Sequence, residues 1–251
     1  MVKLAQLVDY CDDLLEVYRF KDYAPNGLQV QGVDDITNII SGVTACQALI
    51  DAAIEKRAHL LLVHHGYFWR GEDACLVGMK RQRIASLLSA DISLLAYHLP
   101  LDAHPVYGNN AQLAQQLGLL VEGKFGSGEP AIGLYGSLAV PMTATDFASH
   151  LTQVLGREPL HIPGESRQIR RLAWCTGAAQ GYIEQAQALG VDAYLSGEIS
   201  EQTVHVARET GLHYFAAGHH ATERYGAMAL GQHLAQHFGL EHKFVDIDNP
   251  V

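Results

Sequence analysis

Three short segments of this 251-residue sequence contain paired or closely spaced histidines, and two of them also contain a carboxylate residue. The segments VHHG and GHHATE each follow an apolar run, and HLPLDAH lies between them in the sequence. Together they contribute His64, His65, His98, Asp102, His219 and Glu223. At the end of a buried strand, imidazole and carboxylate groups lose hydration, which is costly unless a hydrogen bond or an opposite charge meets them. Three such places in one chain predict a shared metal site.

The spacing within two of the segments predicts that two metal ions bind. Asp102 follows His98 by four residues and Glu223 follows His219 by the same interval, which is one turn of a helix. A carboxylate can bridge two cations that lie roughly 3.5–4 Å apart. The expected ligands are His64, His65, Asp102, His219 and Glu223. For any one of these residues, the alternative is a structural histidine or a solvated carboxylate. Imidazole and carboxylate donors suit divalent Zn, Mn, Fe, Ni or Co and do not distinguish among them.

Two more residues are candidates for acid–base catalysis or for supporting the ligands. They are His98 and Glu198, the latter in the segment SGE. The sequence contains no HExxH, GxSxG, GxGxxG or P-loop motif, so the common zinc-protease, serine-hydrolase, dinucleotide and NTPase signatures are missing. Lys80, Arg81 and Arg224 can pair with a phosphate group, and a solvated basic surface is the competing interpretation.

The pattern of apolar residues places the histidines at the ends of strands in an α/β sheet. The expected elements are strands over 36–43, 60–63 and 92–97 and helices over 3–18, 45–56 and 79–89. In a mostly parallel sheet, ligands bind beyond the carboxyl ends of the strands. His64, His65, His98 and His219 all occupy such positions in the predicted order. This shared position supports the metal site more strongly than the number of histidines does.

A similar order of elements returns in the second half of the chain. It comprises strands over 171–175, 192–195 and 212–217 and helices over 177–189 and 200–209. Aligning the halves sets His98 and Asp102 opposite His219 and Glu223, which favours an internal duplication over chance similarity of two Ala- and Leu-rich units. We therefore expect two similar α/β domains, with the metal site in the cleft between them.

We expect the first α/β domain to cover 1–122 and the second to cover 123–251. The second domain would begin with a glycine-rich stretch, a strand over 132–140 and a helix over 143–155, with Thr143 or Thr145 as its N-cap. A late strand over 243–247 can pair with either sheet, including that of the first domain.

Composition narrows the class of protein. The chain is 48% hydrophobic and 18% charged, as in an ordinary folded protein. Its net charge of −10 argues against binding nucleic acid through the phosphate backbone, but a bound dication would still allow a small anionic substrate. The four cysteines form no CxxC pair, and no apolar run approaches the ~18 residues of a membrane span or resembles a signal peptide. We expect a cytoplasmic protein that does not enter a membrane.

Taken together, APNGLQV, GVTA, VHHGYFW, HLPLDAH, NNAQLA, SGE and GHHATE resemble the Nif-three-like family, also called GTP cyclohydrolase I type 2 homologues. The likeness is to the short bacterial YbgI-type form and runs from Asp22 to Pro250. It implies two α/β domains, a dinuclear metal site and a ring-shaped homohexamer. By motif match it also implies the same five ligands that the residue types predict.

Two functions fit these expectations. The first is a dinuclear metal-dependent hydrolase that acts on a nucleotide-like or heterocyclic small molecule, of cyclohydrolase or phosphoester type. The second is a non-catalytic metal-binding scaffold or regulator that forms an oligomer. A coordination position left open to water would favour the enzyme, and a saturated shell would favour the scaffold.

Overall fold

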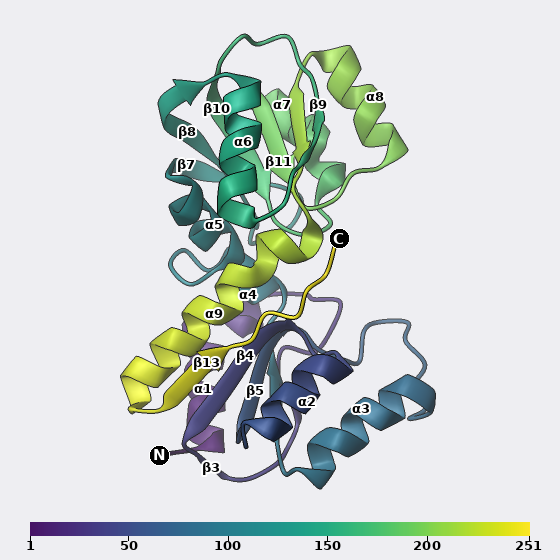
Figure 1. Ribbon diagram of the computed structural model, residues 1–251, viewed down its shortest axis with the longest axis vertical. Helices are drawn as coiled ribbons and strands as arrows, with labels where there is room; N and C mark the ends of the chain where they lie inside the picture. The colour runs from purple at the N-terminus through teal and green to yellow at the C-terminus, as the bar shows by residue number, and fades with distance from the viewer. The chain divides into compact units, whose positions relative to one another are not determined.

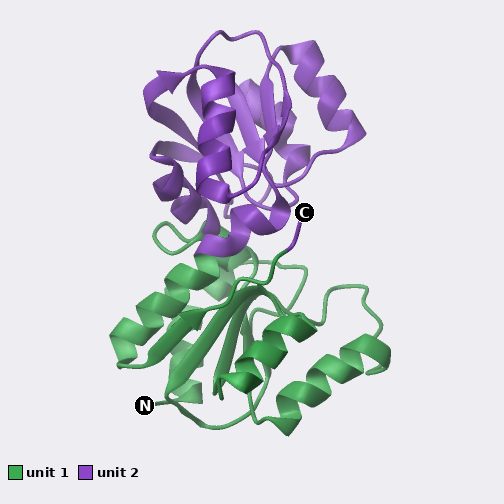
Figure 2. Ribbon diagram, viewed as in Figure 1, with its two compact units in different colours: residues 1–108, 226–248 green, residues 109–225, 249–251 purple.

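The computed structural model describes residues 1–251, which form two compact units (Figures 1 and 2). Unit 1 consists of Met1–Gly108 and Gly226–Asp248, and unit 2 consists of Asn109–Tyr225 and Asn249–Val251. Each unit has its own mixed sheet with helices on both faces. The prediction of two similar α/β domains is therefore confirmed.

Unit 1 is built on a five-stranded sheet in the order β13-β4-β5-β6-β2. Its strands are β2 (Gly27–Val30), β4 (Asn38–Thr44), β5 (Leu60–His65), β6 (Ser93–Ala96) and β13 (Glu241–Phe244). A separate antiparallel pair joins β1 (Val2–Lys3) to β3 (Asp35–Ile36). Strands β13, β4, β5 and β6 are parallel, and β2 is the antiparallel edge. The carboxyl ends of β5 and β6 therefore lie side by side.

Helices cover both faces of this sheet, because its central strands are apolar on both sides. The helices of unit 1 are α1 (Leu4–Leu14), the short η1 (Val17–Arg19), α2 (Gln47–Glu55), α3 (Gly78–Ser89), α4 (Leu99–Ala103) and most of α9 (His219–Phe238). On β5, Leu60 and Leu62 pack with α1 and α9, whereas Leu61 and Val63 pack with α2 and α3. The resulting rigid core fixes the start of the segment that bears His64.

Unit 2 has a six-stranded sheet in the order β7-β8-β10-β11-β12-β9. Its strands are β7 (Leu119–Phe125), β8 (Gly133–Met142), β9 (Leu160–Ile162), β10 (Ile169–Cys175), β11 (Ala193–Ser196) and β12 (His213–Ala216). Its helices are α5 (Asn109–Leu117), α6 (Ala144–Leu155), η2 (Gln180–Tyr182), α7 (Ile183–Ala188), α8 (Glu201–Thr210) and the first turns of α9. Helices α5 and α6 cover one face, and α7 and α8 cover the other.

The two sheets repeat one arrangement of four strands. The order β4-β5-β6-β2 in unit 1 matches β10-β11-β12-β9 in unit 2, with three parallel strands and an antiparallel edge in each. In each case the edge strand precedes the other three in the sequence. Chance similarity between two β–α–β units would not reproduce this added edge strand, so the topology supports an internal duplication.

The register of the strands refines the sequence alignment of the halves. Ala96 pairs with Val63, and Ala216 pairs with Ser196, so these two pairs are equivalent. His98 comes two residues after Ala96, whereas His219 comes three after Ala216. The expected match of His98 to His219 is therefore offset by one residue.

Several element limits differ from those expected. The helix predicted over 3–18 ends at Leu14, because Glu16 adopts a left-handed backbone with φ of 51°. The helix predicted over 177–189 is shorter, since η2 and α7 cover only 180–188 and a loop precedes them. Of the two N-cap candidates for α6, Thr143 and Thr145, the structure has Thr143, which accepts a hydrogen bond from the Asp146 backbone N–H.

The chain enters unit 2 earlier than the expected boundary between residues 122 and 123, which falls inside β7. Helix α5 already belongs to unit 2 because Leu113 and Leu117 pack in its core. The chain then returns to unit 1, where Leu230 and Leu234 of α9 join the core and β13 pairs with β4.

None of the helices combines the length and apolar character needed to cross a membrane.

His242 on β13 makes the stability of unit 1 sensitive to acid. Burial lowers the pKa of His242 to about 4, and its Nε2 lies 2.7 Å from the Ser41 hydroxyl oxygen. The unfolded chain takes up this proton near pH 6.5, so stability falls as the pH drops from 6.5 towards 4. We expect the metal-free protein to lose roughly 2 kcal/mol over this window through His242, after allowance for its partial exposure. Urea unfolding at both ends of the window should show a smaller loss in His242→Gln, and equal losses would contradict this assignment.

Candidate metal centre

The carboxyl edge of the sheet in unit 1 gathers three histidines. His64 and His65 are the last residues of β5, and His98 is the N-cap of α4, which follows β6. Because β5 and β6 are parallel neighbours, these side chains meet at one edge. One ligand nitrogen from each of the three lies within 4.8 Å of the others. The two adjacent histidines thus reach the same cluster, with ring centroids 4.5 Å apart.

The His64 ring presents its Nε2 to Asp102. Its Nδ1 lies 2.9 Å from the backbone carbonyl of Tyr97, which can only accept, so Nδ1 carries the proton. In neutral imidazole, Nε2 then carries the lone pair, and this atom lies 3.5 Å from Asp102 Oδ1. Both side chains are buried. A lone pair and a carboxylate facing each other in a buried site repel unless a cation or a proton lies between them.

Asp102 and His98 are brought together by local helix geometry. The backbone N–H of Asp102 donates to the carbonyl of His98 at 3.1 Å, which closes the helical turn predicted from the spacing. Helix α4 is short, and Pro100 in its first turn suits a helix start because proline lacks the N–H that would go unused there. His65 is held from β4, where the Thr44 hydroxyl oxygen lies 3.3 Å from its Nδ1.

The sequence interpretation missed Asp22, which holds His98 in place. Asp22 Oδ1 lies 2.7 Å from His98 Nδ1, while its Oδ2 accepts from the Leu99 backbone N–H and the Asn26 amide. Burial alone would raise the pKa of Asp22, but these contacts outweigh it and lower the pKa to about 2. The carboxylate is therefore ionised and fixes which nitrogen of His98 carries its proton. Asp22 lies 76 residues from His98, and no sequence spacing connects them.

Unit 2 carries a second cluster at the start of α9. His219 Nε2 lies 3.1 Å from Glu223 Oε2, and its Nδ1 lies 2.7 Å from Glu198 Oε1. Glu198 follows β11, and His219 follows β12, so the two again come from the carboxyl ends of parallel neighbours. By strand register, Glu198 occupies the position in unit 2 that His65 occupies in unit 1.

The two carboxylates make the His219 position attractive to a cation. Burial would lower the pKa of His219, yet Glu223 and Glu198 outweigh it and raise the pKa to about 9. Without metal, the imidazole is therefore protonated near neutral pH. A divalent ion at Nε2 can replace that proton, while Nδ1–H continues to donate to Glu198. The donors in both clusters are imidazole and carboxylate, which suit a divalent transition metal.

Gly177 leaves the space in front of these ligand atoms open. A Cβ at this position would lie 2.1 Å from Glu223 Oε1 and 3.2 Å from His219 Nε2. Its φ of +68° also favours glycine. The Thr222 hydroxyl oxygen accepts from the Gly177 backbone N–H at 3.1 Å and fixes the loop. The sequence interpretation placed Gly177 in a helix and missed this role.

We expect Gly177→Ala to weaken metal binding at least ten-fold, because the new methyl group displaces Glu223. Gly190→Ala is the matched control, since Gly190 has φ of +65° and open space around its Cβ position. Both variants carry the same backbone strain of roughly 1 kcal/mol. Calorimetric titration with Zn²⁺ should show a lower affinity in Gly177→Ala than in Gly190→Ala. Equal affinities in the two variants would show that Gly177 does not contribute to the site.

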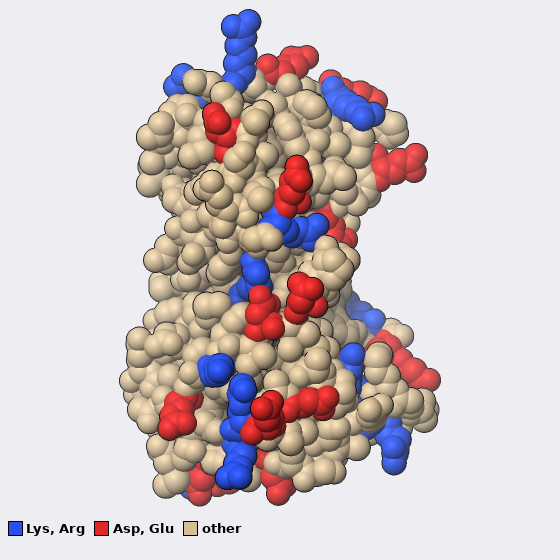
Figure 3. All heavy atoms as spheres, viewed as in Figure 1, with Lys and Arg blue, Asp and Glu red and all other residues tan.

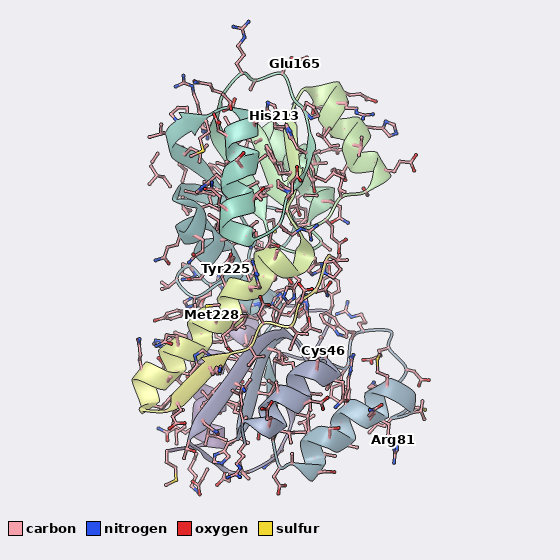
Figure 4. All side chains as sticks on the ribbon, viewed as in Figure 1. Cys46, Arg81, Glu165, His213, Tyr225 and Met228 are labelled. Atoms are coloured by element: carbon pink, nitrogen blue, oxygen red, sulfur yellow. The ribbon has the colours of Figure 1, made fainter.

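The basic residues proposed to bind phosphate have different surroundings. Lys80 Nζ donates to the Asp73 carbonyl and lies 3.3 Å from Glu72 Oε1, so it holds its own loop. Arg224 donates to the Leu155 carbonyl. Arg81 extends away from α3 (Figure 4). On the face shown in Figure 3, Lys and Arg are scattered among Asp and Glu and form no continuous patch.

Comparison with known proteins places the chain in a family. The family described as Duf34/NIF3 (NGG1p interacting factor 3) matches residues 2–250. A Pseudomonas aeruginosa protein named "GTP cyclohydrolase 1 type 2 homolog" is 60% identical over 251 residues, which cover 100% of this chain and 99% of that protein. A Vibrio cholerae protein of the same name is 51% identical, with 98% of each chain covered.

Solved structures agree with this assignment. The structure titled "Structural genomics, protein ybgI, unknown function" has a TM-score of 0.96 and 47% identity, with both chains covered in full. A protein of Thermus thermophilus has a TM-score of 0.92 and 32% identity, again over 100% of both chains. The match over the whole length, in sequence and in fold, shows that this chain belongs to the Duf34/NIF3 family.

Proposed function

We propose that the chain is a metal-dependent hydrolase with a dinuclear centre. The observation that carries this proposal is the shared design of the two clusters. In each cluster, an imidazole makes a hydrogen bond through Nδ1. The partner of His64 is a backbone carbonyl, and the partner of His219 is a carboxylate. In each, Nε2 then faces a carboxylate, Asp102 or Glu223. Such outer hydrogen bonds orient metal-ligating histidines in general.

In this proposal the two clusters contribute to one centre that holds two divalent ions. The ligands are His64, His65, Asp102, His219 and Glu223. Asp102 and Glu223 would hold the ions through carboxylate oxygens, and the three histidines would hold them through ring nitrogens. The burial of both carboxylates supports this arrangement, because a buried carboxylate is stabilised by a cation beside it. The donor atoms fit Zn, Mn, Fe, Ni and Co alike.

Two such ions, when bound, supply an activated water and polarise the bond to be cleaved. The remaining chemistry falls to residues of the chain. His98 is the proposed proton donor and acceptor, since Asp22 holds its Nδ1 and leaves the other side of the ring facing the cluster. Glu198 is the other candidate, and we propose that it positions His219 by accepting a hydrogen bond from its Nδ1.

The proposed substrate is a nucleotide-like or heterocyclic small molecule with a C–N or P–O bond to be hydrolysed. The name of the Pseudomonas aeruginosa and Vibrio cholerae relatives, which refers to GTP cyclohydrolase, supports this class. We further propose that the chain acts in the cytoplasm as a ring-shaped homohexamer. Sedimentation equilibrium would test the hexamer, and a monomer or dimer at micromolar concentration would contradict it.

A substrate screen tests the proposed function. The purified protein, loaded with each candidate metal in turn, is offered nucleotides, pterin precursors and phosphoesters. We expect turnover of at least one compound that requires metal and is lost in Asp102→Ala. A non-catalytic scaffold would be supported instead if no compound were turned over and X-ray absorption spectroscopy showed every coordination position of the metal filled by protein ligands.

A further inference from the structure

Two aromatic rings flank the histidine cluster of unit 1. Trp69 lies in the loop after β5, with its ring centroid 5.0 Å from that of His98 and an interplanar angle of 83°. The same ring is 5.9 Å from the ring of His65. Tyr23, from the loop before β2, meets His98 at 6.3 Å and 65°. Both aromatic side chains therefore make edge contacts with one imidazole.

Hydrogen bonds hold the Trp69 ring and the backbone of Tyr23 in place. The Trp69 indole N–H donates to the Gly66 carbonyl at 3.2 Å. The backbone N–H of Arg70 donates to the Tyr23 carbonyl at 2.6 Å, and the Arg70 guanidinium donates to the Asp22 carbonyl at 2.9 Å. That guanidinium also lies 6.0 Å from the centre of the Tyr23 ring. The two loops are thus tied together beside the cluster.

The loop that carries Trp69 contains one residue with a strained backbone conformation. Phe68 has φ of 65°, a conformation that a bulky residue rarely adopts. Lys80 lies 5.0 Å from the centre of the Phe68 ring and also holds the loop through the Asp73 carbonyl. Strain of this kind persists where the surrounding contacts determine the conformation, and it concentrates at functional sites. Here the strained residue directly precedes Trp69.

We propose that Trp69 and Tyr23 form a stacking site for the planar heteroaromatic ring of the substrate. This inference rests on the proposed function and adds to it the residues that bind the ring of the substrate. Tyr23 is 59% exposed although it lies beside the histidines, and Trp69 is also partly open to solvent. An aromatic face in such a position binds a planar ring, because every nucleobase or pterin has a π face to stack. Stacking there places the ring next to His98.

Tryptophan fluorescence provides a direct test. The chain has two tryptophans, and Trp174 is fully buried in unit 2 with its N–H on the Asn110 carbonyl. A ring stacked on Trp69 should therefore quench only part of the emission. Guanosine 5′-monophosphate, titrated into the Zn²⁺-loaded protein, is expected to quench saturably. Ribose 5-phosphate, which has no ring system, should not, and equal effects of the two compounds would overturn the proposal.

Variants separate stacking from structural effects. Calorimetry should show that Tyr23→Ala and Trp69→Leu bind guanosine 5′-monophosphate roughly ten-fold or more weakly, as loss of one stacked base predicts. Trp69→Phe keeps a flat ring and should retain most of the affinity. Tyr18→Ala is the control, because Tyr18 is 80% exposed and outside the cluster. Unchanged affinity in Tyr23→Ala and Trp69→Leu would overturn the proposal.

The outcomes distinguish this inference from the proposed function. If compounds with a planar ring bind but none is hydrolysed, the stacking site is supported and the proposed hydrolase activity is contradicted. If the protein hydrolyses a substrate without a ring in a metal-dependent reaction, and Trp69→Leu does not change the rate, the hydrolase activity is supported and the stacking site is contradicted.

Discussion

Asp102→Ala and Glu223→Ala are each expected to abolish tight metal binding while the protein stays folded. In the proposed centre, each variant removes one of the two carboxylates that would hold the ions. The cores of both units consist of apolar side chains and include neither carboxylate, so the fold does not depend on them. Plasma mass spectrometry after dialysis against Zn²⁺ measures the metal, and circular dichroism measures the fold.

Asp102→Asn separates the effect of the lost charge from the effect of the smaller side chain in Asp102→Ala. The amide fills the same space without the charge, so it should also bind metal poorly. If Asp102→Asn retained full metal content, the charge argument would fail. If Asp102→Ala were unfolded before any metal was added, the residue would be structural.

Glu198→Gln is expected to weaken metal binding roughly 10- to 100-fold, the usual effect of removing an outer partner of a histidine ligand. The amide can still accept a hydrogen bond from His219 Nδ1–H, but it no longer stabilises positive charge on the ring. The pKa of His219 should therefore fall below its present value of about 9. Zn²⁺ titration gives the affinity, and NMR titration of the metal-free variant gives the pKa.

Glu201→Gln is the matched control for Glu198→Gln. Glu201 begins α8, three residues from Glu198, and its side chain is exposed. The control should leave both the affinity and the His219 pKa unchanged. Unchanged affinity in Glu198→Gln itself would show that Glu198 does not position His219.

Local sequence spacing predicted the parts of the site that depend on one element. Asp102 lies one helical turn after His98, and Glu223 one turn after His219, as short-range helix geometry requires. Apolar runs likewise located the strands β5 and β6 that end beside the histidines. These features follow from periodicity within about ten residues, which a sequence records directly.

Contacts between distant segments could not be predicted in the same way. Asp22 supports His98 from a loop, and Gly177 opens the space before Glu223 from another loop. Neither residue has a periodic pattern around it, and each role arises only when the sheet is assembled. The return of α9 and β13 to unit 1 has the same origin, because core packing decides which sheet they join.

Metal stoichiometry tests the central claim most directly. The protein is freed of metal with a chelator, reloaded with Zn²⁺ and dialysed, and its metal content is measured against protein concentration from amino-acid analysis. Two ions per chain, falling in both Asp102→Ala and Glu223→Ala, is the predicted result. A stable content of one ion per chain that depends on only one of these carboxylates would contradict a shared dinuclear centre.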